Sequence, residues 1–294
     1  MRFWFHIFAF FLLTMASGCS GLVLPSDRPE IVIEGWIEDG GYPVVILTQS
    51  IPVNTEYQDM EVLNEYLIRW AKVTVSDGER EVVLAGGPDD RYFPPYIYTT
   101  ARMRGEAGKT YKLTVEYSGR VETAETTIPE KVPLKYIKVR EAAEGYEIVA
   151  GLSDDPQTKD YYRFFSMVEG VDSTYVPSFL GLVDDAVLKD GVTDISVNSA
   201  FISNFAAVER SPMCYLEEDV VNIRFSRMEE SVFNYWSDYD DVTSLASNPF
   251  FPVNKKIRSN VSSGMGYWAG YGSSYYRVSV ADSLAQGRVW PKGE

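Results

Sequence analysis

Short β-type segments, separated by glycine-containing turns, fill the first hundred residues that follow position 30 and restrict this part to a β-rich fold. Residues 31–37 (IVIEGWI) and 43–48 (PVVILT) flank Asp39-Gly40-Gly41, where glycine accepts positive φ at little cost. Residues 71–84 repeat this arrangement around Asp77-Gly78, a dipeptide typical of tight hairpins. Successive strands are therefore expected to pair as antiparallel neighbours.

The number and spacing of these segments predict an architecture. About seven short strands within roughly 100 residues are typical of an immunoglobulin-like β-sandwich. We expect such a sandwich in residues 29–130, with Pro129 and Pro133 marking its end. A second β-rich domain with one helix is expected in residues 131–294. The predicted fold class is therefore mainly β, an immunoglobulin-like sandwich followed by a second β-rich domain.

One segment of the second region has helical periodicity, and we predict a helix near residues 227–246. Ser226-Arg227-Met228-Glu229 fits a capping box at its start. Asn248-Pro249 would end it, because the residue before proline avoids the α region. The apolar residues that recur every three or four positions are Val232, Trp236, Tyr239, Val242 and Leu245. This stripe is expected to pack on a sheet.

The N-terminus has the pattern of a bacterial secretion signal. Residues 3–13 are uncharged and mostly apolar, but they are too few to span a bilayer, which takes about 20 residues. Small residues at positions 16–18 precede Cys19, as in a lipobox. We expect a signal peptide in residues 1–18, acyl chains such as palmitate on Cys19, and a tether over residues 19–28. Ordinary secretory cleavage near Gly18 is the alternative.

Charge and histidine content exclude several functions. The chain carries a formal net charge of −15, which disfavours binding to nucleic acid. Its single histidine is His6, inside the predicted signal. The mature chain therefore lacks the imidazole of Ser-His-Asp and Cys-His catalysis and of His-ligated zinc. We expect no enzyme activity, no metal and no cofactor, and we expect Cys214 to be a small buried side chain rather than a nucleophile.

Carboxylates are the remaining candidates for chemistry. A carboxylate pair can hydrolyse a glycosidic bond, but it needs two acids facing each other across a cleft, which adjacency in sequence does not establish. We expect these acids to be solvated, with a carboxylate-dependent glycan hydrolase as the alternative. The adjacent pairs are Asp89-Asp90, Asp154-Asp155, Asp184-Asp185 and Asp240-Asp241.

Residues 262–272 (SSGMGYWAGYG) combine glycines with aromatic rings. The glycine spacing fits neither G-x-G-x-x-G nor a P-loop, and no Lys-Ser/Thr pair follows, so nucleotide binding is excluded. Glycine inside a strand permits a bend or a close backbone approach. Tyr267 and Trp268 can face either a ligand or the core, and we expect the core.

Several of these segments together resemble a known family. Residues 248–250 (NPF), 257–261 (IRSNV) and 264–270 (GMGYWAG) are similar to the C-terminal signature of the domain of unknown function 4249 family. Residues 31–37 resemble its first strand, and residues 108–129 its closing sandwich hairpin. The resemblance implies a lipoprotein of Bacteroidota that accompanies a SusC-like TonB-dependent outer-membrane transporter. No activity is established for the family as a whole.

The residues and the resemblance together give a functional hypothesis. We expect a lipid-anchored outer-membrane protein, on either face of that membrane, that acts as a non-enzymatic accessory or binding component of nutrient uptake. Aromatic side chains can stack on a glycan or peptide ligand, and the candidates are Trp36, Trp70, Tyr267 and Trp268. A structural or adhesive surface protein is a further alternative.

Overall fold

The computed structural model describes residues 29–51, 64–153, 157–188, 191–199, 214–246, 255–262 and 264–286. These residues form a mainly β fold with a helix packed against a large sheet, as predicted. The predicted signal peptide and Cys19 lie outside the described residues, as do Asp154-Asp155 and residues 248–250.

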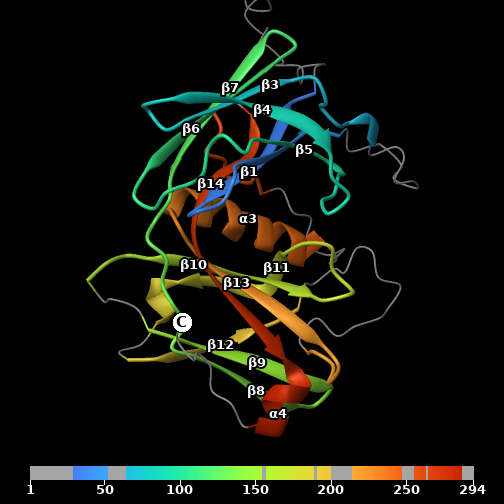
Figure 1. The fold of residues 1–294 in the computed structure, drawn as a ribbon, viewed down its shortest axis with the longest axis vertical. Coiled ribbons are helices and arrows are strands. Elements are labelled where there is room, and N and C mark those ends of the chain that lie inside the picture. Colours follow the sequence, from blue (N-terminus) through green and yellow to red (C-terminus); the bar gives the residue numbers. More distant parts are fainter. Residues whose placement is uncertain are drawn as a thin grey trace, which may run out of the picture.

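The strands divide between two halves of the molecule, which lie one above the other in Figure 1. The strands of the upper half are β1 (Ile31–Glu38), β2 (Val44–Gln49), β3 (Lys72–Ser76), β4 (Glu81–Pro88), β5 (Tyr96–Thr99), β6 (Thr110–Tyr117) and β7 (Arg120–Thr127). Those that follow are β8 (Tyr136–Ala142), β9 (Gly145–Leu152), β10 (Tyr161–Val168), β11 (Val176–Asp184), β12 (Thr193–Val197), β13 (Val220–Met228) and β14 (Met265–Ser279). The helices are α3 (Glu230–Ala246) and the short α4 (Val280–Gln286), which was not predicted.

One continuous sheet of eleven strands runs through both halves, in the order β11-β10-β13-β14-β1-β2-β5-β4-β3-β6-β7. In the upper half it curls around a core of apolar side chains from β1, β3, β6 and β7. In the lower half it packs on a second sheet, β12-β9-β8, and the two enclose another core. The helix α3 lies between the halves (Figure 1).

Strand β14 joins the two halves. Its first part, from Met265 to Tyr271, pairs with β1 in parallel, and its second part, from Gly272 to Ser279, pairs with β13 in antiparallel fashion. It is therefore the long red strand that crosses most of the molecule in Figure 1. The last strand of the predicted second domain thus extends the sheet of the predicted first domain.

Glycines in β14 let the backbone approach its neighbours. A Cβ on Gly266, whose φ is +103°, would lie 1.9 Å from the carbonyl oxygen of Ile33. A Cβ on Gly270 would lie 2.5 Å from the carbonyl oxygen of Thr127, the last residue of β7. Since both obstacles are backbone atoms, they cannot move aside as a flexible side chain could. The glycine-rich segment is therefore the site where β14 fits between β1 and the end of β7.

Asn260 holds the start of β14 in place. Its side-chain amide donates to the carbonyl oxygen of Trp268 at 2.8 Å and accepts from the Trp268 N–H at 3.0 Å. These two bonds imitate the pairing of a neighbouring strand. The Ser262 N–H donates to the carbonyl oxygen of Thr123 at 2.8 Å, so the same segment is also tied to β7.

The predicted capping box is wrong, although the helix exists. Ser226 belongs to β13, and its hydroxyl bonds that of Ser273 across the β13–β14 pair at 2.9 Å. The helix begins at Glu230. The Glu229 carboxylate accepts from the hydroxyl of Thr126 and from the N–H of Thr127, at 3.0 and 2.9 Å. The pairing of β13 with two neighbours therefore outweighed the local capping signal.

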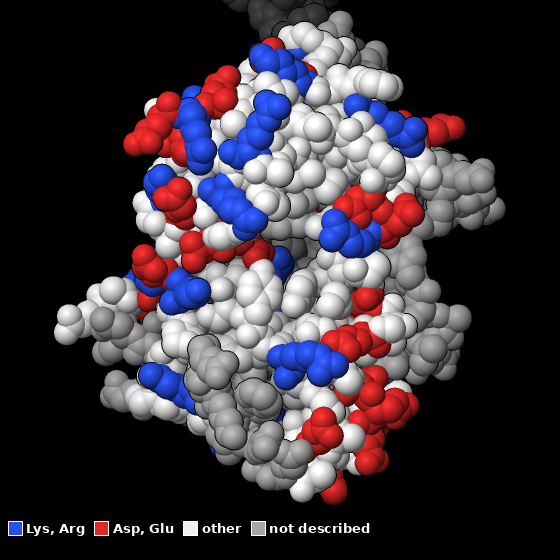
Figure 2. Space-filling view, in the orientation of Figure 1, with Lys and Arg blue, Asp and Glu red and all other residues white. Residues whose placement is uncertain are grey.

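Charged side chains are mixed over the face shown in Figure 2. Basic side chains are scattered among acidic ones over the upper half, whereas acidic side chains gather along one edge of the lower half. In the described part of the chain, no helix is long and apolar enough to cross a membrane.

Replacing Gly270 by alanine tests the close approach of β14 and β7. We expect Gly270→Ala to lower the free energy of unfolding by roughly 1–3 kcal/mol, the usual cost of overpacking. Gly87→Ala is the control, because nothing lies within 4 Å of a Cβ at that position in β4. Urea denaturation of both variants measures the difference, and equal stabilities would contradict the packing described.

Candidate functional site

A cavity of about 710 Å³ lies between the two halves. Its walls come from β1, β2 and β5 of the upper half, from β10, β11, β13 and α3 of the lower half, and from β14, which belongs to both. Two loops, residues 89–93 and 171–175, complete the lining. Aromatic side chains contribute most of the bulk: Trp36, Tyr42, Tyr92, Phe93, Phe165, Tyr175, Tyr235, Trp236, Tyr239, Tyr267, Tyr271 and Tyr275.

The alternation of side chains in β1 places three residues in this cavity. Ile31, Ile33 and Ile37 point into the upper core and are almost completely buried. Because successive side chains of a strand point to opposite faces, Glu34, Trp36 and Glu38 point the other way. All three line the cavity.

Side chains of β14 also point alternately toward the upper core and toward the cavity. Trp268 points into the upper core, where its indole N–H donates to the carbonyl oxygen of Tyr111 at 3.0 Å. Tyr267, Tyr271 and Tyr275 project toward the cavity. Burial raises the pKa of Tyr271 to about 12, so this phenol is neutral at physiological pH.

Helix α3 supplies a second aromatic wall. The ring centroids of Tyr235 and Tyr267 are 4.6 Å apart, and those of Trp236 and Tyr267 are 5.2 Å apart. The indole N–H of Trp236 donates to the Tyr271 hydroxyl at 2.9 Å. Tyr239, one turn after Tyr235, lines the same cavity and is more exposed. The contacts between α3 and β14 thus fix the positions of the rings.

An ion pair connects the halves beside the cavity. Arg224 of β13 donates to Glu38 of β1 at 2.5 Å, and both side chains are nearly buried. The Tyr275 hydroxyl donates to the other oxygen of Glu38. The Arg224 guanidinium also lies 3.9 Å from the ring centroid of Phe165. Glu38 is therefore fully engaged with groups of its own protein.

A contact between two loops forms the rim of the cavity. Arg91 donates to Asp89 through two nitrogens, at 2.9 and 2.6 Å. The Ser173 hydroxyl donates to the carbonyl oxygen of Arg91 at 3.0 Å, which joins the loop of the upper half to that of the lower half. Asp172, next to Ser173, accepts from the N–H of Val168 at 2.8 Å.

Glu34 differs from the other acids of the cavity. No hydrogen bond or ion pair links its carboxylate to any residue that the structure describes. Its side chain is exposed within the cavity, and the surrounding protein reduces its solvation, which raises the pKa of Glu34. The charge of Glu34 also contributes to the raised pKa values of Tyr235 and Tyr239, after the larger effect of burial.

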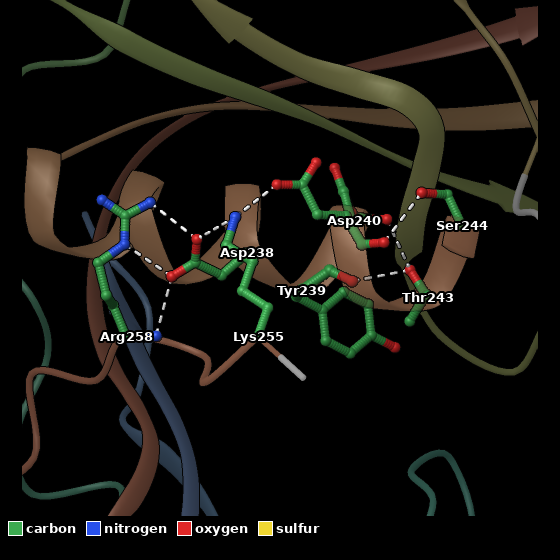
Figure 3. A network of polar contacts seen from close by, with 8 residues as sticks. Asp238, Tyr239, Asp240, Thr243, Ser244, Lys255 and Arg258 are labelled. Carbon is green, nitrogen blue, oxygen red and sulfur yellow. Dashed lines mark hydrogen bonds and ion pairs between the residues drawn. The ribbon is translucent and has the colours of Figure 1, made fainter. Parts of the chain in front are cut away.

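Ion pairs attach α3 to the segment that precedes β14 (Figure 3). Asp238 is buried and accepts from the side chain of Arg258 at 2.6 and 2.8 Å and from its N–H at 2.9 Å. Lys255 donates to the same carboxylate at 2.7 Å and also reaches Asp241 at 2.5 Å. These contacts lower the pKa of Asp238 well below its usual value. The helix is thereby tied to the segment that leads into β14.

A second ion pair ties α3 to the sheet. Arg163 of β10 donates to both oxygens of Asp240, at 3.0 and 2.8 Å. Its guanidinium lies 4.2 Å from the ring centroid of Trp236. The acids of the helix therefore anchor it on two sides while its aromatic residues face the cavity.

The structure brings two of the four predicted ligand-binding residues to the cavity. Trp36 and Tyr267 line it. Tyr267 is also buried, as predicted, in the cluster of aromatic side chains between α3 and β14. Trp268 is completely buried in the upper core, whereas the side chain of Trp70 is 89 % exposed and lies elsewhere on the surface. Cys214 is half-buried rather than fully buried.

The adjacent acid pairs in the described residues have structural roles at one or both positions. Asp89 pairs with Arg91, Asp184 accepts from the N–H of Ala186 at 2.8 Å, and Asp240 and Asp241 belong to the ion pairs of α3. Sequence reasoning missed Glu34, Tyr235 and Arg224. For Glu34 a signal existed in β1. Glu34, Trp36 and Glu38 occupy alternate positions, on the face opposite the isoleucines of that strand.

Comparison with known protein families gives one match. Residues 22–277 match the model of a family described as "Domain of unknown function (DUF4249)". The match extends through both halves of the structure and includes every residue that lines the cavity. A search of curated proteins gave no match.

Replacing Asp238 by asparagine tests the anchoring of α3. We expect Asp238→Asn to lower the free energy of unfolding by about 2–3 kcal/mol at pH 7, because a buried carboxylate with several charged donors is lost. The folded-state pKa of Asp238 lies below its ordinary value of 3.8, so its contribution is complete above pH 3.8 and is lost as the pH falls through the folded-state pKa.

Denaturation between pH 7 and pH 2 measures this effect, and the difference between the variant and the original protein should shrink as the solution becomes acidic. Asp241→Asn is the control, because that carboxylate is 55 % exposed and its ion pair with Lys255 is worth little. A loss at Asp241 as large as that at Asp238 would contradict this prediction.

Replacing Glu34 by glutamine tests its environment. A carboxyl group with a raised folded-state pKa stabilises the protein below its ordinary value of 4.5, and this contribution is lost as the pH rises through the folded-state pKa. Glu34→Gln should therefore raise the midpoint of thermal unfolding at pH 7.5 and have no such effect at pH 4. Glu79→Gln, at an exposed turn, is the control for the change in net charge. A lower midpoint for Glu34→Gln at pH 7.5 would show that the carboxylate has a stabilising partner.

Proposed function

The chain belongs to the DUF4249 family, and on that premise we propose that it is a non-enzymatic, lipid-anchored binding component of a TonB-dependent uptake system at the outer membrane of a member of the Bacteroidota. The observation that supports binding is the cavity between the halves. Its volume of about 710 Å³ falls within the range of small-molecule sites, roughly 300–1,000 Å³. Its aromatic walls suit stacking against the rings or apolar faces of a glycan or a peptide.

The acids of the cavity favour binding over hydrolysis. Glu38 and Asp89 are each paired with an arginine, and Asp172 at the rim accepts from the N–H of Val168. Glu34 is the lining acid that has no hydrogen bond or ion pair with any residue that the structure describes. Glu34 and Glu38 are four residues apart on one strand, or about 13 Å at the usual rise. Glycan hydrolysis requires two carboxyl groups roughly 5–9.5 Å apart. A glycan hydrolase therefore remains the weaker alternative, and an adhesive protein would have no need of such a cavity.

The membrane anchor is proposed from the sequence at Cys19. We expect Cys19→Ser to move the protein from the membrane fraction to the soluble fraction, because burial of the acyl chains supplies the attachment. Cys214→Ser is the matched control, since it removes a thiol from the folded body and leaves the proposed anchor intact. Fractionation of cells that express each variant measures the outcome. Retention of Cys19→Ser in the membrane fraction would contradict lipidation at that residue.

The proposed partner is tested by co-purification. The full-length chain with a C-terminal affinity tag is extracted from outer membranes in a mild non-ionic detergent. We expect a TonB-dependent transporter of the SusC-like class to accompany it in a fixed stoichiometry. Recovery of the tagged chain as a lone monomer would count against a stable complex with a transporter.

A further inference from the structure

The strongest unassigned feature of the cavity is the position of Glu34. The alternation of β1 directs it away from the apolar core and into the cavity, and its partner in the parallel register with β14 is Tyr267. Neither arginine of the lining neutralises it, because Arg91 is bonded to Asp89 and Arg224 to Glu38. Among the residues that the structure describes, no cation compensates the charge of this carboxylate.

Aromatic rings surround this uncompensated charge. Tyr267 lies beside it on β14, and Tyr235 and Tyr239 come from α3. The ring of Tyr235 contacts those of Tyr239 and Tyr267, and all three tyrosines line the same cavity as Glu34, so the three phenols and the acid share one wall. Trp36, two residues further along β1, points into the same cavity. Since burial raises the pKa values of these tyrosines, the rings stay neutral and keep their electron-rich faces at physiological pH.

A carboxylate among neutral aromatic rings favours one class of ligand. The ring faces and the acid both attract positive charge, and both interactions are strengthened where water is restricted. A metal ion would need several oxygen ligands, whereas one carboxylate among rings offers a single strong one. An organic ammonium group has an apolar surface that the rings can contact. It also has a positive charge that complements the negative charge of the carboxylate.

We propose that Glu34, Trp36, Tyr235 and Tyr267 bind the ammonium group of an organic cation. This inference rests on the proposed function of the cavity as a ligand site and specifies the chemistry of that ligand. The Glu38–Arg224 pair lies further along the same wall and carries no net charge, so it does not repel the cation. The rest of the ligand would occupy the aromatic remainder of the cavity.

Choline and its neutral isostere 3,3-dimethylbutan-1-ol provide the test, because they differ mainly in charge. Each is titrated into the purified full-length protein in a non-ionic detergent. The change in total tryptophan fluorescence, to which Trp36 and Trp236 of the cavity contribute, reports occupancy. We expect saturable binding of choline that is about tenfold tighter, or more, than binding of the isostere, as a charge-assisted contact implies. Equal binding of the two compounds would overturn the proposal and would indicate a neutral, hydrogen-bonded ligand.

Two variants locate the site. Glu34→Gln should weaken choline binding about tenfold or more and leave the isostere unaffected, whereas Glu79→Gln should bind choline like the original protein. Trp36→Leu, which keeps apolar bulk but removes a ring, should weaken choline binding about threefold. Circular dichroism and urea denaturation establish that each variant is folded. Unchanged choline binding by a folded Glu34→Gln variant, or no saturable binding by the original protein, would overturn the proposal.

The outcome is distinguishable from a failure of the proposed function. If the transporter co-purifies but choline does not bind, the uptake role stands and the ammonium site is wrong. If choline binds through Glu34 but no transporter accompanies the protein, the cation site stands and the proposed partner is wrong.

Discussion

The structure depends on the close approach of β14 to two other backbones. Its first part must lie beside β1 on one side and near the end of β7 on the other, where Gly266 and Gly270 leave no room for a Cβ. Its second part then joins β13. The first and last strands of the fold therefore meet through a segment in which side chains are excluded at fixed positions. Everything that lines the cavity is placed relative to that segment.

The local part of the fold could be predicted from the sequence. Alternating segments and glycine turns specify hairpins such as β3–β4 and β6–β7, because the pairing residues are neighbours in the chain. The helix could be predicted from the period of its apolar residues, but its first residue could not. Ser226 belongs to β13 instead, which pairs with β10 and β14. The parallel pairing of β1 with β14 joins residues more than 200 positions apart. No local pattern specifies such a contact.

The site was predictable in part, for a similar reason. The choice between Tyr267 and Trp268 follows from which face of β14 meets the upper core, and this is decided by the partner strand rather than by either residue. Trp268 therefore packs in the core, and its neighbour reaches the cavity. Glu34 could have been suspected from its alternation with isoleucine in β1. That Glu34 has no ion-pair partner among the described residues could not have been predicted, because the arginines of the cavity come from distant segments of the chain.

The continuity of β14 has a consequence for how a ligand enters. An unbroken strand of fifteen residues runs through both halves, and the Glu38–Arg224 pair and α3 add cross-links beside it. The halves therefore do not form a hinge, because opening them would separate β14 from β1 or β13. Exchange of the cavity contents must instead pass the rim, where a hydrogen bond from the Ser173 hydroxyl to the Arg91 carbonyl oxygen joins two loops. We therefore expect the framework to determine which ligand fits, and the contact between these loops to affect the rate at which a ligand enters and leaves.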